Sequence, residues 1–156
     1  MPSTPYTQSL LLYAYQATAR DLVAALHRSG HGAIRPKHGA VFANLDQDGT
    51  RPSVLAERAG IGKPAMGELV DELERLGYVE RRPDPADRRA RLVVATPRAL
   101  EVVDIVHEVN DRIERRLRRD LGAEGYRALR DALTAIAPGG QPQPRIPPAR
   151  RRGGAA

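Results

Sequence analysis

The 156-residue chain contains no cysteine and no tryptophan, and it has one phenylalanine and four histidines. The absence of cysteine excludes disulfides, thiol nucleophiles and zinc sites built from cysteine. A metal site would therefore need histidine together with carboxylates. No segment approaches the ~18 consecutive apolar residues of a membrane-spanning helix. The first 30 residues lack the basic start and apolar run of a signal peptide. We expect a cytoplasmic protein with no cofactor and no membrane partner.

Lysine is also scarce, because Lys37 and Lys63 are the only two and arginine supplies 23 of the 25 basic residues. The net charge is +6, and residues 138–156 contribute +4 of it through four arginines and no acid. This Pro/Gly/Arg-rich segment has almost no large apolar side chains, which predicts disorder. We therefore expect one folded domain over residues 1–137 and a disordered tail over 138–156.

Apolar residues recur at helical spacing on both sides of a β-prone stretch. Their spacing and the glycines that interrupt it predict helices over residues 8–29, 37–45, 52–59 and 63–76. Short β-prone runs at 78–79 and 92–94 flank a loop of Pro, Asp and Arg, which predicts a hairpin with a charged tip. Thr96 and Pro97 form a helix start. A long helix to about Arg119 and another over 123–136 follow.

The order of helix, glycine break, amphipathic helix and hairpin is that of a winged helix-turn-helix. If Pro52 is position 1 of the unit, Ala56 is a small residue at position 5 and Gly60 is the turn glycine at position 9. The small residue lets two helices cross closely, and glycine readily adopts the positive φ of the turn. Positions 8, 10, 15 and 18 are apolar, as expected, and hold Ala59, Ile61, Met66 and Leu69.

The stretch LAERAGIGKPAMGELVDELERLGYVERRPDPADRRARLVVATP resembles the MarR family of winged-helix transcription regulators. The resemblance covers about residues 8–137, and its most specific part is the Asp-Arg-Arg wing in YVERRPDPADRRARL. It implies a mostly α fold with a small β-hairpin wing. The winged helix-turn-helix of about 37–96 would lie between dimerisation helices of about 8–29 and 97–137. The resemblance also implies a homodimer on a palindromic operator in double-stranded DNA, released by a small aromatic or carboxylate ligand.

The helix over 63–76 and the wing are the expected DNA-binding elements. When Met66 is placed at the centre of the buried stripe, Pro64, Gly67 and Glu68 face away from the core. This face is small and acidic, whereas family members often have Ser, Thr and Arg there. Glu68 can accept a hydrogen bond from cytosine and Ala65 can touch a thymine methyl, although Glu68 also suits a solvent face that contacts no base. The expected DNA-binding residues are Ser53, Lys63, Pro64, Ala65, Gly67, Glu68, Arg81, Arg88, Arg89 and Arg91.

The wing concentrates positive charge, since residues 81–91 contain five arginines and two aspartates, for a net charge of +3. A narrow minor groove has strong negative potential and attracts inserted arginine. By resemblance, Arg89 is the minor-groove residue. We expect Asp87 to support the wing by holding Arg88 or Arg89 through a charge-assisted hydrogen bond.

A ligand site is less clearly marked. By resemblance, its pocket is lined by segments that contain Tyr13, Tyr15, Arg20, His31, Arg35, His38 and His107. We take Tyr13, Arg20, His31 and His38 as ligand-binding candidates. Arginine with histidine or tyrosine suits a carboxylate or phenolate, although each residue alone also fits a packing or surface role. The alternative effector is zinc, held by histidines and carboxylates drawn from His31, His38, His107, Asp104, Glu108 and Asp111.

The terminal helices carry more apolar surface than a small monomer can cover, which predicts an obligate homodimer. The expected dimer residues are Leu11, Leu12, Tyr15, Val109, Ile113, Leu117, Leu129, Leu133 and Ile136. No nucleophile, base and orienting group converge, so we do not expect an enzyme. The favoured function is a ligand-responsive, sequence-specific DNA-binding transcriptional repressor. Two alternatives remain: a nonspecific or architectural DNA-binding protein, and a protein-interaction module that has lost DNA binding.

Overall fold

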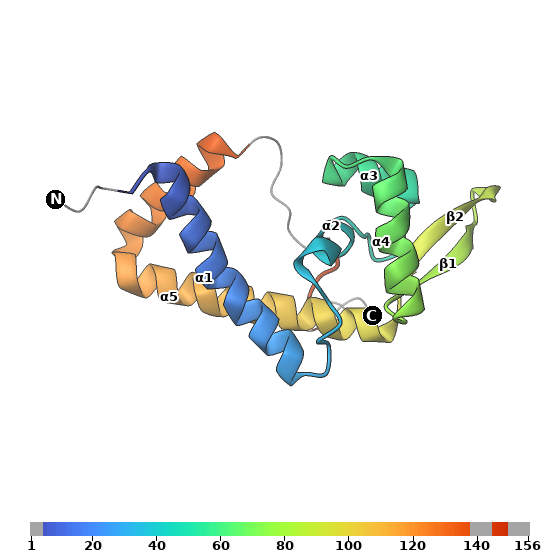
Figure 1. Ribbon diagram of the computed structural model, residues 1–156, viewed down its shortest axis with the longest axis horizontal. Helices are drawn as coiled ribbons and strands as arrows, with labels where there is room; N and C mark the ends of the chain where they lie inside the picture. The colour runs from blue at the N-terminus through green and yellow to red at the C-terminus, as the bar shows by residue number, and fades with distance from the viewer. Residues whose placement is uncertain (1–4, 138–144, 150–156) are drawn as a thin grey trace.

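The computed structural model describes residues 5–137 and 145–149, which form an arm and a lobe (Figure 1). The arm consists of α1 (Thr7–Arg28) and α5 (Pro97–Ile136), which pack against each other. The lobe, residues 36–96, consists of a 3-10 turn η1 (Pro36–His38), α2 (Gly39–Phe42), α3 (Pro52–Ala59), α4 (Lys63–Arg75), β1 (Val79–Asp84) and β2 (Asp87–Ala95). The hairpin projects from the end of the molecule opposite the N-terminal end of α1.

The helix-turn-helix follows the sequence expectation closely. Helix α3 has Pro52 in its first turn, where no intrahelical N–H is needed, and it ends at Gly60 with φ of 65°. This left-handed conformation suits glycine. Helix α4 ends at Arg75, one residue before the predicted end. The helix predicted over 37–45 is shorter than expected, because η1 and one turn of α2 end at Phe42.

One apolar core holds the lobe on the arm. Helix α4 buries Met66, Val70 and Leu73 at helical spacing, which confirms the predicted stripe. These side chains pack in a single cluster with residues of α2, α3, the hairpin, the residue before β1 and the first turns of α5. The cluster includes Val41, Phe42, Leu55, Tyr78, Val93, Val102 and Val103. The core therefore positions α4 with its opposite face exposed.

The hairpin is longer than the sequence predicts. Its antiparallel register runs from Val79 opposite Ala95 to Asp84 opposite Asp87, with an irregularity at Pro83 and Asp84. The charged stretch expected to form a loop is therefore mostly strand, and only residues 85–86 connect the two strands. Ladder hydrogen bonds form whatever the exposed side chains are, so the low β-propensity of charged residues is overridden. The wing arginines consequently stand on strands in a defined register.

Helix α5 starts as predicted, because the Thr96 side chain accepts a hydrogen bond from the Ala99 N–H. At Gly122 the backbone leaves the helical conformation, with φ of 71° and ψ of 173°. The helix is kinked there into the two segments expected from the sequence. None of the described helices combines the length and apolar character required to cross a membrane.

The prediction of a disordered segment over 138–156 is wrong for residues 145–149. Ile146 is fully buried and belongs to the core cluster of the molecule. The sequence pattern missed this contact because a lone apolar residue among prolines and arginines has no periodicity. The other residues of the predicted tail lie outside the described part of the chain.

Candidate nucleic-acid interface

The side of α4 that faces away from the core presents small side chains. Lys63, Pro64, Ala65 and Glu68 are exposed, and Gly67 is partly exposed. Apart from its chain neighbours and the nearby backbone of α4, a Cβ atom added at Gly67 would meet no atom of the described residues within 4 Å. The backbone of α4 is therefore open to a close approach from outside the molecule at this position. Ser53, in the first turn of α3, is also exposed.

The second strand of the wing carries its free positive charge. Arg88, Arg89 and Arg91 are exposed on β2, and none has an acidic partner among residues 5–137 and 145–149. The Asp87 carboxylate accepts a hydrogen bond from the main-chain N–H of Arg89 at 3.0 Å. Asp87 thus holds Arg89 through its backbone rather than through its guanidinium, and it leaves that guanidinium available for an external anion.

Arg81 occupies a different place from the other wing arginines. Its guanidinium pairs with Asp71 at 2.5 Å and also with Glu74, both on α4. Burial alone would lower the pKa of Arg81, but these carboxylates outweigh it and raise the pKa above the usual value. Arg81 therefore neutralises acidic residues of α4 and ties β1 to that helix. This placement gives no support to the predicted direct contact of Arg81 with DNA.

A buried carboxylate that the sequence analysis did not single out organises the turn of the wing. Asp84 is only 7% exposed and accepts hydrogen bonds from the Ala86 N–H at 2.9 Å and from Arg51 Nε at 2.7 Å. The hydrogen bond from the Ala86 backbone, followed by that from Arg51, lowers the pKa of Asp84. The Asp-Pro pair was an available signal, because Asp often bonds the backbone two residues ahead in a turn.

Two histidines proposed as ligand contacts instead connect elements inside the protein. His31 Nδ1 lies 3.0 Å from the Tyr78 hydroxyl, and its Nε2 lies 3.3 Å from Glu101. His38 is completely buried, and its Nδ1 accepts a hydrogen bond from the Arg35 N–H. Both side chains are thus engaged in packing at the junction of lobe and arm.

An apolar cavity of about 180 Å³ lies between α1, α2 and α5. Arg35 and Asn110 are polar residues of its lining, and the apolar lining includes Leu22, Val23, Leu26, Ile34, Phe42, Val102, Val103 and Val106. The four ligand-binding candidates from the sequence, Tyr13, Arg20, His31 and His38, are not part of this lining. Tyr13 is exposed on α1, and Arg20 borders a shallow surface beside Tyr15 and His27.

The zinc alternative gains no support from the described residues, among which no group of three histidines or carboxylates is placed to hold a metal ion. His107 instead lies with Nε2 3.0 Å from the Ile146 carbonyl oxygen. A carbonyl oxygen only accepts, so His107 Nε2 carries the proton in this contact.

The predicted dimer residues fall into three groups. Leu11, Leu12, Tyr15, Leu133 and Ile136 are exposed, by 38% to 62%. Ile113, Leu117 and Leu129 are half-buried. Val109 is only 1% exposed within a single chain, so its burial needs no partner. The arm therefore retains a broad apolar surface at both of its helices, without Val109.

A sequence model of the MarR family matches residues 32–90, which include α3, α4 and most of the hairpin. Over these residues the chain is similar to the MarR family. Transcriptional regulator HosA of Escherichia coli O111:H- is 28% identical over 80 residues, which cover 51% of this chain and 59% of HosA. The chain thus matches less than two thirds of the length of this relative.

Solved structures extend the similarity beyond residues 32–90 to the arm of the chain. The transcriptional regulator Tm0710 of Thermotoga maritima is 28% identical, with a TM-score of 0.55 over 83% of this chain and 89% of Tm0710. The S. aureus MepR–DNA complex has a TM-score of 0.68 at 19% identity, over 85% of this chain and 97% of MepR. MepR bound to ethidium bromide has a TM-score of 0.60 at 20% identity, over 85% and 94%. The predicted winged-helix fold is confirmed, and the regulators named here agree with the expectation that the protein is not an enzyme.

Proposed function

We propose that this protein is a transcriptional regulator that binds double-stranded DNA through α4 and the wing. The observation that carries the proposal is a set of exposed arginines on β2, next to the open face of α4, that have no acidic partner in the described part of the chain. They are Arg88, Arg89 and Arg91. Arginine suits phosphate and the narrow minor groove, where negative potential is concentrated. The MarR-family match over the same elements supports this assignment. Such a regulator would act in the cytoplasm of a bacterium, where its DNA target lies.

In the proposed complex α4 enters the major groove. Pro64, Ala65 and Gly67 present little side-chain bulk, so the helix can approach base edges closely. Lys63, at the start of α4, would contact phosphate, which fixes position without reading sequence. Ala65 suits a thymine methyl, and Glu68 suits the amino group of cytosine. Base preference would then come from shape and these two short contacts rather than from arginine on guanine.

We further propose that two chains associate through the arm. The exposed residues of α1 and α5 supply an apolar surface for this contact, and a two-fold dimer would place two copies of α4 on one side. Half-sites of the operator would then lie about one helical turn, ~34 Å, apart. Light scattering at micromolar concentration tests the dimer, and a folded monomer would contradict it.

The cavity between α1, α2 and α5 is the proposed ligand site. Its volume of about 180 Å³ is below the ~300 Å³ of typical drug-sized sites, so it suits a small ligand with an apolar body. Arg35 at its edge would pair with a carboxylate or phenolate. Because the cavity touches both the arm and the lobe, a ligand that favours a DNA-incompetent orientation would release the DNA. Replacing Arg35 should weaken the ligand response and leave DNA binding without ligand intact.

Selection of genomic fragments by the purified protein, followed by footprinting, tests the function. Protection of one pseudo-palindrome is the expected result. Uniform protection along the fragment would favour the nonspecific or architectural alternative. A reporter under the selected promoter then tests the proposed sign of regulation, and expression that falls when the protein is present supports a repressor.

A further inference from the structure

The segment of residues 145–149 joins the lobe to the arm, although it is separated from both in the sequence. Arg145 Nε donates a hydrogen bond to Asp46 Oδ1 at 2.6 Å. Asp46 lies in the loop before α3, within the lobe. Ile146, the next residue, is bonded through its carbonyl oxygen to His107 on α5. Arg145 thus contacts the lobe, and the next residue, Ile146, contacts the arm.

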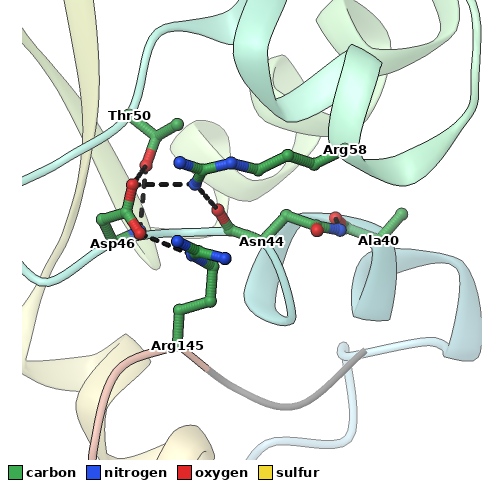
Figure 2. Close-up of polar contacts among 6 residues, drawn as sticks. All are labelled: Ala40, Asn44, Asp46, Thr50, Arg58 and Arg145. Atoms are coloured by element: carbon green, nitrogen blue, oxygen red, sulfur yellow. Dashed lines mark hydrogen bonds and ion pairs between the residues drawn. The ribbon is translucent and has the colours of Figure 1, made fainter. Parts of the chain in front are cut away.

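On the lobe side, Arg145 enters a polar network around Asp46 (Figure 2). Asp46 Oδ2 also accepts from Arg58 Nη1 at 2.7 Å, and Arg58 donates to the Asn44 carbonyl oxygen at 2.9 Å. The Thr50 hydroxyl contacts Asp46 as well. Burial alone would raise the pKa of Asp46, but the hydrogen bonds from Arg145 and Arg58 outweigh it and lower the pKa. The carboxylate therefore stays ionised and links Arg145 to the end of α3.

On the arm side, the segment is held at two successive turns of α5. His107 Nε2 donates to the Ile146 carbonyl oxygen at 3.0 Å, and the Ala149 N–H donates to Asp104 Oδ1 at 2.9 Å. Between these contacts stand Pro147 and Pro148, whose rings restrict φ and reduce the conformational entropy lost on docking. Residues 145–149 are therefore a short segment of restricted conformation, which suits binding to the surface of α5.

The two kinds of contact contribute differently. The Ile146 side chain has no exposed surface and packs in the core cluster, so its burial provides most of the attraction. The side chain of Arg145 is 50% exposed and that of Asp46 is 36% exposed, and such pairs contribute little net stability. The ion pair between Arg145 and Asp46 instead determines which part of the lobe contacts residues 145–149.

We propose that residues 145–149 form a clasp that fixes the lobe in one orientation on the arm, with Arg145 as a positioning residue for DNA binding. The DNA part of this inference rests on the proposed function. A dimer that reaches two half-sites must hold both lobes at a set separation. Lobes that already have that orientation lose less conformational freedom on binding. Release of the clasp therefore widens the range of lobe orientations and weakens operator binding.

The absence of cysteine allows a direct test by pulsed electron paramagnetic resonance. Spin labels are attached to Arg28→Cys on α1 and Glu57→Cys on α3, both exposed positions. Mixing with excess unlabelled chain isolates the distance within one protomer. The full chain should give one narrow distance distribution. Ile146→Ser and Arg145→Glu should broaden it, whereas the control Arg145→Lys, which keeps a cation beside Asp46, should leave it narrow.

The same unlabelled variants are titrated on the selected operator fragment. Affinity should fall about fivefold for Ile146→Ser and Arg145→Glu through lost preorganisation, and it should be retained in Arg145→Lys. Unchanged distance distributions in both disruptive variants would overturn the clasp. Broadened distributions with unchanged affinity would overturn the positioning role of Arg145. If the full chain binds no DNA, the proposed function fails, and the distance distributions still decide whether the clasp exists.

Discussion

The Arg51 and Asp84 side chains meet at 2.5 Å, from Arg51 Nη2 to Asp84 Oδ2, and so tie the turn of the wing to the residue that precedes α3. Asp84 also accepts from the Ala86 N–H inside the turn. Asp84 therefore links the turn of the wing to the helix-turn-helix, in addition to the ion pairs of Arg81 with α4. The wing is a braced element rather than a free charged loop.

Replacing Asp84 by Asn should loosen the wing while the core remains folded. Asn keeps the size but loses the charge that pairs with Arg51, so operator affinity should fall about tenfold, the loss of one charge-assisted contact.

The lowered pKa of Asp84 means that its contribution to stability is present above its unfolded pKa of ~3.9 and is lost as the pH falls through the folded pKa. The free energy of unfolding is compared with its own value at pH 7 for each protein. On acidification it should fall more in wild type than in Asp84→Asn, because only wild type loses the ionised Asp84. Identical acid transitions would contradict the assigned role.

Asp87→Ala should weaken DNA binding although it removes a negative charge near DNA. Simple electrostatics predicts tighter binding. We expect severalfold weaker binding because Asp87 accepts from the Arg89 main-chain N–H and so fixes the backbone of that arginine. Asp87→Asn is the matched control, since its side-chain oxygen can still accept this hydrogen bond. Tighter binding by Asp87→Ala than by wild type would mean that the wing acts only as a diffuse positive patch.

Arg81→Ala should reduce DNA affinity by exposing two carboxylates of α4 rather than by removing a contact. Arg81 pairs with Asp71 and Glu74, and unpaired acids next to the groove repel phosphate. The triple variant Arg81→Ala, Asp71→Asn, Glu74→Gln should regain most of the lost affinity, measured by fluorescence anisotropy on one operator fragment. If the triple variant binds as weakly as Arg81→Ala, then Arg81 itself contacts the DNA.

Gly67→Ala separates folding from recognition. Alanine is favoured over glycine in a helix interior by up to ~1 kcal/mol. The added Cβ would meet no other element of the described structure within 4 Å. Thermal unfolding should therefore move to a higher temperature. Operator affinity should fall at the same time if the backbone of α4 lies against the bases. A stabilised variant with unchanged affinity would show that the DNA does not approach this glycine.

The sequence predicted the helix-turn-helix well because its signals are local. The stripe of Met66, Val70 and Leu73 and the turn at Gly60 depend only on neighbours within a few residues. The roles of Arg81 and Asp84 were not predictable in this way. Their ion-pair partners lie 7 to 33 residues away in sequence and come into contact only when the hairpin folds back on α3 and α4.

The ligand candidates illustrate the same limit. His31 and His38 have the right chemistry for an anion, yet Tyr78, Glu101 and the Arg35 backbone already engage them. A residue type indicates what a side chain can bind, whereas the fold determines which groups of the protein already contact that side chain. Ile146 was missed for a related reason, since burial of a single residue in a proline-rich segment leaves no periodic pattern.

The central claim is that the arginines of β2 bind DNA. It is tested most directly by measuring the operator affinity of Arg89→Ala at a series of salt concentrations. Arg89 is exposed and lacks an acidic partner among the described residues, so the substitution should change stability by only about ±0.5 kcal/mol. Operator affinity should fall at least tenfold, ~1.4 kcal/mol, and the slope of log affinity against log salt should decrease by about one unit. The matched control is Arg82→Ala, because Arg82 already pairs with Glu80 on β1, and its slope should change less. Equal affinities and equal slopes for Arg89→Ala and wild type would contradict the account.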